Sequence, residues 1–97
     1  MTAADHAGLA LGACGVAKDA HDHAQACATI GYGVLAELWM AVAMSAAAVA
    51  CTHAEIATRL GVDADQAENL AALQDLATVW MSGAATAARG CVTRWGT

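Results

Sequence analysis

Alanine is the feature that most limits what this chain can fold into: 28 of its 97 residues are alanine, and proline is absent. Alanine is the best helix former because it loses almost no side-chain entropy in a helix, whereas proline is the commonest helix breaker. The sequence therefore predicts an all-α fold, either a helical hairpin or a small helical bundle. Since neither a repeat nor a linker divides the chain, residues 1–97 are expected to form a single α-helical domain.

The first helix is expected over residues 3–11. Thr2 can cap it, and Asp5 lies three residues later, where the helix dipole favours negative charge. Gly12 and Gly15 follow and are expected to end it, because glycine is unfavourable inside a helix.

A second helical region is expected over residues 19–51, bent into two segments at Gly31 and Gly33. In its latter segment the i, i+3, i+4 spacing of an apolar helix face is followed by Leu35, Leu38, Val42 and Val49. Trp39, Met40 and Met44 make its other faces apolar as well. A helix that is apolar nearly all round is expected to be buried, either centrally in a bundle or against a second subunit.

Residues 52–61 are expected to form a short helix of their own. Thr52 and Glu55 have capping-box spacing, and Gly61 can adopt the left-handed conformation that ends a helix.

A long third helix is expected from Asp63, its cap, to about Gly90, with residues 91–97 as a tail. Its apolar seam comprises Leu70, Leu73, Ala77, Trp80 and Ala84. The fold is thus expected to contain two long helices joined through a short one, and a hairpin folded near residue 57 would bring Cys27 near Cys91 and Cys51 near Asp63.

The chemical groups of the chain do not form a recognisable catalytic set. The four cysteines are widely spaced without a C-x-x-C pair, so they are expected to be small buried hydrophobes. Asp19, His23 and Cys27 share one helical face and could contribute metal ligands, but a fourth ligand is not evident. The chain is therefore expected not to be an enzyme and to hold no cofactor or metal.

Charge and hydropathy argue against two classes of partner. The net charge of −5 provides no basic footprint for a phosphate backbone, so nucleic acid is not an expected partner. The apolar run 34–51 is about as long as the shortest spanning helices, ~17 residues, but Glu37 within it makes a membrane role unfavourable. The start of the chain lacks the pattern of a secretory signal, which predicts a cytoplasmic protein.

A local resemblance lies between residues 53 and 72. Its helix-helix spacing is carried by Ile56, Ala57, Leu60, Gly61, Val62, Ala67 and Leu70. This pattern resembles the helix-turn-helix motif of bacterial regulators and sigma-factor regions, which implies that the second helix enters the major groove of DNA. Where that family presents basic or amide side chains, this chain has acidic Asp63, Asp65 and Glu68, which would repel phosphate.

The function expected from these features is binding of another protein. The residues expected to contact the partner are Trp39, Met40, Met44 and Trp95, because they offer large, adaptable apolar area. A homodimer that shares the apolar faces of the middle helix is one form of such binding. By analogy of size and charge with phage-encoded antagonists, the chain would be a small acidic regulator or inhibitor that occludes a surface. The alternatives are a dimeric helix-turn-helix transcriptional regulator and a metal-binding or redox helical protein.

Overall fold

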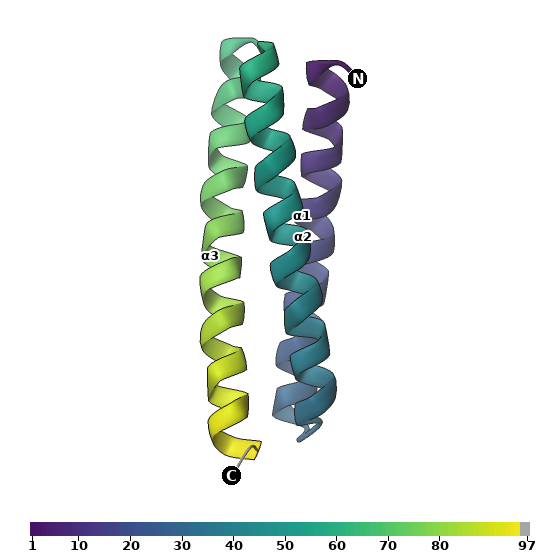
Figure 1. Ribbon diagram of the computed structural model, residues 1–97, viewed down its shortest axis with the longest axis vertical. Helices are drawn as coiled ribbons and strands as arrows, with labels where there is room; N and C mark the ends of the chain where they lie inside the picture. The colour runs from purple at the N-terminus through teal and green to yellow at the C-terminus, as the bar shows by residue number, and fades with distance from the viewer. Residues whose placement is uncertain (96–97) are drawn as a thin grey trace.

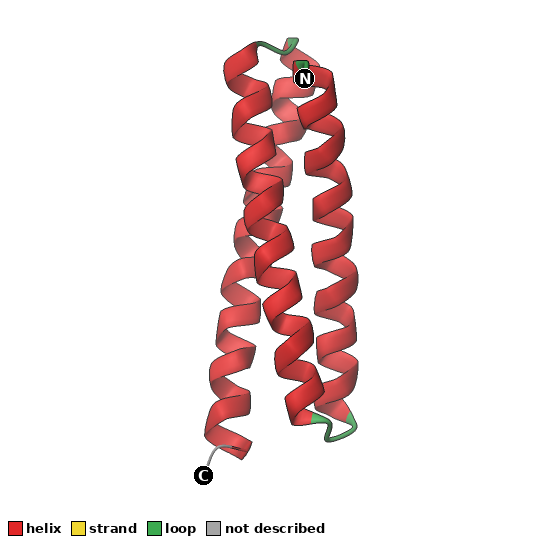
Figure 2. Cartoon of the chain, turned by 45° about the vertical axis from the view of Figure 1, so that its right-hand side comes forward, coloured by secondary structure: helices red, strands yellow, loops and turns green. Residues whose placement is uncertain are grey.

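The computed structural model of the protein describes the backbone of residues 1–95 and the side chains of residues 1–82. Three long helices, α1 (Ala3–Thr29), α2 (Gly33–Leu60) and α3 (Ala64–Trp95), follow one another through short turns. Each helix runs antiparallel to the one before it, so the molecule is a rod of 49 × 17 × 16 Å (Figures 1 and 2). The expected all-α small bundle is confirmed.

The N-terminus of α1 has the predicted cap. The backbone N–H of Asp5 donates to Thr2 Oγ1 over 3.2 Å, and the N–H of Thr2 donates to Asp5 Oδ2 over 2.9 Å. Hydrogen bonding of the Asp5 carboxyl by the Thr2 backbone N–H, and secondly by the Thr2 side chain, lowers the pKa of this carboxyl because it stabilises the charged form.

The predicted end of this helix at residue 11 is wrong. Gly12 and Gly15 lie inside α1, which continues unbroken to Thr29. A methyl group added at either glycine would meet nothing within 4 Å. The helix passes through both glycines because alanines before and after them pack on α2, and this tertiary contact outweighs a local cost of about 1 kcal/mol per glycine.

The chain reverses at Gly31 instead of bending there. Gly31 has a φ of 90° and its N–H donates to the carbonyl of Ala28, while the N–H of Tyr32 donates to the carbonyl of Cys27. This pair of bonds is the Schellman arrangement, which ends a helix at a residue with positive φ. Gly33 then begins α2 as a buried residue.

The predicted short helix over residues 52–61 is the last part of α2. The Thr52 hydroxyl donates to the Ala48 carbonyl, four residues back, so it does not cap a new helix. Glu55 forms an ion pair with Arg59 instead of reaching back to Thr52. The two long helices are therefore joined by a turn and not by a helix.

The turn between α2 and α3 follows the predicted chemistry. Gly61 ends α2 with a φ of 99°, and Asp63 Oδ1 accepts the N–H of Gln66 over 2.7 Å at the start of α3. α3 runs to Trp95, beyond the end predicted near Gly90, so most of the expected tail is helical.

The packed face of α2 is lined almost entirely by alanine. We call it the inner seam; its residues alternate three and four apart and are Gly33, Ala36, Met40, Ala43, Ala47, Ala50, Ala54 and Ala57. The facing side of α1 is also mostly alanine: Ala7, Ala10, Cys14, Ala17, Ala20 and Ala24. This alternation is the heptad pattern of a coiled coil, and its small side chains allow the two backbones to approach closely.

α3 completes the core with larger residues. Leu70 and Leu73 pack against alanines of both α1 and α2 near the α2–α3 turn, and Ala77 meets Ala17 and Ala47 farther along. The predicted seam of this helix is confirmed for Leu70, Leu73 and Ala77, and Trp80 is half-buried beside them. Ala84 lies outside the described side chains.

A larger side chain in the alanine contact should destabilise the bundle. Ala17 is fully buried where all three helices meet, so Ala17→Leu is expected to lower the free energy of unfolding by about 1–3 kcal/mol through overpacking. Ala26→Leu, at an exposed position of the same helix, should change it by no more than about 0.5 kcal/mol. Urea unfolding of both variants measures the difference, and equal stabilities would contradict the close packing.

Glycine replacements should have opposite signs at two positions. Gly12→Ala is expected to stabilise the protein by about 0.5–1 kcal/mol, because the site is helical and open. Gly61→Ala is expected to destabilise it, since alanine is strained at a φ of 99° although space is available. Thermal and urea unfolding of the two variants would show this reversal, and a destabilising Gly12→Ala would argue that α1 is broken there.

Candidate interaction surface

α2 carries a second heptad seam, which faces solvent. We call it the outer seam; its residues again alternate three and four apart and are Leu35, Leu38, Val42, Ser45, Val49, Thr52 and Ile56. The exposed fractions of its first three apolar residues are 46% for Leu35, 59% for Leu38 and 42% for Val42. Val49 is 47% exposed and Ile56 is half-buried. The apolar face predicted to be buried is therefore largely exposed, because the alanines on the other side of α2 make its contacts within the bundle.

The middle of the outer seam, from Leu38 to Thr52, lies on a stretch of chain without charge. No Asp, Glu, Lys or Arg occurs between Glu37 and Glu55. Among the described side chains no polar or charged residue is fully buried, so the buried helix contacts are apolar. Exposed apolar rows of this kind are typical of surfaces that bind another molecule.

An apolar hollow adjoins the outer seam at the α1–α2 turn. It is an open depression of about 670 Å³ lined by Gly31, Tyr32, Gly33, Val34, Leu35 and Leu38. Leu35 and Leu38 belong to both the hollow and the outer seam. Ile30, Tyr32 and Val34 are also strongly exposed here, so several apolar side chains are exposed together at this end of the rod.

The four residues predicted to contact a partner fall in different places. Met40 is only 2% exposed and packs with alanines of α1 and α2, so it belongs to the core and offers no surface. Trp39 is half-buried and Met44 is 39% exposed, on either side of the inner seam. The side chain of Trp95 lies outside the described residues.

Sequence reasoning missed the outer seam as the exposed surface of α2. Leu35, Leu38, Val42 and Val49 follow the spacing of one helix face, but this helix is expected to be buried, either centrally in a bundle or against a second subunit, because it is apolar nearly all round. The alanines of the inner seam have the same alternating spacing of three and four residues. This pattern was the sequence feature that could have indicated a second packing face. Only the matching alanines of α1 show which of the two seams is buried.

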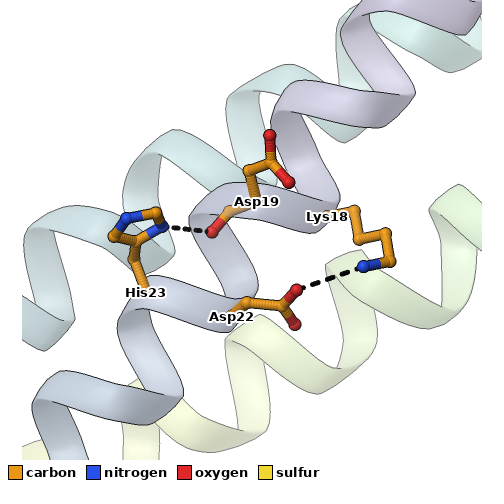
Figure 3. Close-up of polar contacts among 4 residues, drawn as sticks. All are labelled: Lys18, Asp19, Asp22 and His23. Carbon is orange, nitrogen blue, oxygen red and sulfur yellow. Dashed lines mark hydrogen bonds and ion pairs between the residues drawn. The ribbon is translucent and has the colours of Figure 1, made fainter.

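The predicted metal face on α1 does not bring ligands together. His23 Nδ1 lies 2.7 Å from the carbonyl oxygen of Asp19, so this nitrogen carries the proton and donates (Figure 3). The His23 ring also stacks on Trp39 with centroids 4.6 Å apart. Lys18 and Asp22 pair with each other on the same surface (Figure 3). Among the described residues no group of three His, Cys, Asp or Glu side chains is placed to hold a metal ion.

Two histidines connect the start of α1 to the end of α2, far from the α1–α2 turn. His6 Nδ1 and His53 Nδ1 are 2.9 Å apart, and the ring centroids are separated by 5.1 Å with the ring planes 26° apart. These distances place both nitrogens between the rings, so the rings meet almost edge to edge. Between two neutral rings, one Nδ1 carries a hydrogen and donates it, and the other Nδ1 accepts the hydrogen bond. The two rings are then different tautomers.

The three described cysteines are free thiols. Burial raises the pKa of the Cys14 thiol, with a smaller contribution from nearby Cys51, and burial also raises the pKa of Cys51. The expectation that the cysteines are small buried hydrophobes is confirmed for Cys14, whereas Cys27 and Cys51 are half-buried.

The predicted cysteine neighbours depend on where the hairpins turn. Cys51 packs near Ala77 and not near Asp63, because the chain reverses at residues 61–63 instead of residue 57. Cys27 packs against α2, while the side chain of Cys91 lies outside the described residues.

The region that resembles a helix-turn-helix comprises the end of α2, the turn at residues 61–63 and the start of α3. α2 and α3 run antiparallel, side by side (Figure 1), whereas the two helices of a DNA-binding motif cross at about 90–120°. Asp63, Asp65 and Glu68 are exposed where that motif would face DNA. Nothing in the described structure shows the DNA-binding geometry.

By length and composition, α2 is the one helix among the described residues that could span a membrane. The core helix of a soluble protein and a signal sequence meet the same criterion.

Comparison with known proteins supplies no relative: no family model, curated protein or solved structure matches the chain.

The histidine pair should be energetically coupled. His6→Ala and His53→Ala are each expected to destabilise the protein, but the double variant should lose about 0.5–1.5 kcal/mol less than the sum of the two, because the shared hydrogen bond is lost only once. Urea unfolding of the double-mutant cycle measures this coupling. The control cycle pairs His23→Ala with His53→Ala, which share no partner and should be additive. Additivity in both cycles would contradict the hydrogen bond.

Proposed function

We propose that this protein is a non-enzymatic protein-interaction module that binds its partner through the outer seam of α2. It would act by assembly, or by covering a partner's surface in the manner of a small acidic regulator or inhibitor. The observation that carries this proposal is the division of α2 into two seams. Alanines supply nearly all of its packing within the bundle, and its larger side chains Leu35, Leu38, Val42 and Val49 remain exposed.

The energetics favour an occupant for this surface. Covering apolar side chains is favourable by about 25 cal/mol per Å² removed from water, and a soluble chain gains nothing from leaving a row of them exposed. The adjoining hollow at Tyr32 and Val34 extends the same surface to the end of the rod. An aliphatic row of this kind is suited to a second apolar helix, which would pack its side chains between those of the outer seam.

The charges of the neighbouring helix favour a protein over a bilayer. α1 packs along α2 and carries exposed Lys18, Asp19 and Asp22. Full insertion of the bundle would take these groups out of water, at about 2.5 kcal/mol or more for each charge near the bilayer centre. A bundle exposed to water, with one apolar surface for a partner, avoids that cost. This supports the proposal of a cytoplasmic protein.

The proposal can be tested with one substitution and a matched control. Leu38→Asp places a charge in the middle of the apolar surface, whereas Leu11→Asp changes a similarly exposed leucine, 62% against 59%, on α1. Tagged wild-type and variant chains are produced in the native host, cross-linked, captured and analysed by mass spectrometry. We expect one set of proteins, which can include the untagged chain itself, to be recovered with wild type and Leu11→Asp and reduced at least tenfold with Leu38→Asp.

Two results would contradict this function. Recovery of the same proteins with both aspartate variants would place the contact elsewhere. Stoichiometric binding of duplex DNA that weakens steeply with salt would support the transcriptional regulator instead, because phosphate contacts release counterions.

A further inference from the structure

We propose that the occupant of the outer seam is a second copy of this chain, with the two α2 helices antiparallel and a two-fold axis near Ser45. This inference rests on the proposed function and names the partner. Two α1–α2–α3 rods would lie with their α2 helices in contact and their α1–α2 turns at opposite ends. The assembly would contain six helices around one apolar interface.

The order of residues along the outer seam is nearly unchanged by reversal about Ser45. Reversal brings Leu38 opposite Thr52 of the second copy, and it brings Val42 and Leu35 to within one residue of Val49 and Ile56. Ser45 meets its own counterpart on the axis, where a small side chain allows the helices to approach. A two-fold interface requires such self-complementarity, because one surface must serve both copies.

The length of the outer seam suits a helix pair. Residues 35–56 cover three heptads, about 32 Å of helix at 1.5 Å per residue. The exposed parts of these side chains amount to on the order of 500 Å² per copy, which is below the ~600–1,000 Å² per partner that stable interfaces bury and is typical of weak association. We therefore expect association at micromolar concentrations.

Electrostatics permits this arrangement. No charged residue lies on the outer seam, and Glu37 is located on a different side of α2, at the c position of the heptad that begins at Leu35. Glu55 borders the seam, but Arg59 holds it in an ion pair of 2.6 Å. Antiparallel α2 helices also bring opposite dipole ends together, which favours this orientation over the parallel one. Since each copy carries a net charge of −5, salt should screen their repulsion and strengthen the dimer.

Sedimentation equilibrium of the full chain over about 1–200 μM tests self-association, with far-UV circular dichroism as the check on folding. We expect a monomer–dimer equilibrium that Leu38→Asp weakens at least tenfold and Leu11→Asp leaves within about twofold. Ser45→Arg is a second variant at an exposed polar position, which should fold normally and place two like charges on the axis. It should weaken the dimer as well.

Disulfide trapping tests the orientation of the two α2 helices. The native cysteines are first replaced by alanine, and this cysteine-free protein is checked for dimerisation. Mixing Leu38→Cys with Thr52→Cys chains should give the mixed disulfide in an antiparallel dimer. Leu38→Cys linked preferentially to itself would overturn the antiparallel arrangement.

The remaining outcomes separate the two proposals. A chain that stays monomeric at 200 μM, or a dimer that Leu38→Asp does not weaken, overturns the second copy as partner. The proposed function then stands only if capture still depends on Leu38 and recovers a different protein. A third outcome is a chain that is monomeric without lipid but floats with neutral phosphatidylcholine vesicles. If Leu38→Asp abolishes that flotation, the outer seam binds lipid, and both the second copy and the protein-interaction function are overturned.

Discussion

The structure depends on the contact between the alanine rows of α1 and α2. Each buried alanine removes little surface from water, so the contact is favourable only if many of them meet over a long distance and at short range. Dispersion between closely spaced backbones then adds to the small hydrophobic term. This requirement explains why both helices are long and why α1 continues through Gly12 and Gly15 without interruption.

A contact of this kind restricts where large side chains can go. Leu35, Leu38 and Val42 placed between α1 and α2 would hold the two backbones apart and open gaps beside the neighbouring alanines. They lie on the other side of α2 instead, where the bundle leaves them uncovered. The close packing inside the protein and the apolar surface outside it thus have one origin. The proposed interaction surface follows from the way the core is built.

Much of the local structure could be read from particular residues. The caps at Thr2 and Asp63 and the helix end at Gly61 depend on hydrogen bonds or backbone angles within a few positions, and all three are present. Thr52 shows where this reasoning fails. Its spacing to Glu55 fits a capping box, but packing of Ala50, Ala54 and Ala57 on the bundle keeps α2 continuous through it.

The sequence by itself determined that the chain is helical, that one helix ends at Gly61, and that the first part of α2 is apolar nearly all round. Alanine content, glycine positions and capping residues are local properties, so they can be judged without knowing what lies next to them. Only the tertiary structure decided which side of α2 is buried, because that choice depends on the row of alanines that α1 presents across the interface. The side of α2 that stays exposed is the surface available to a partner.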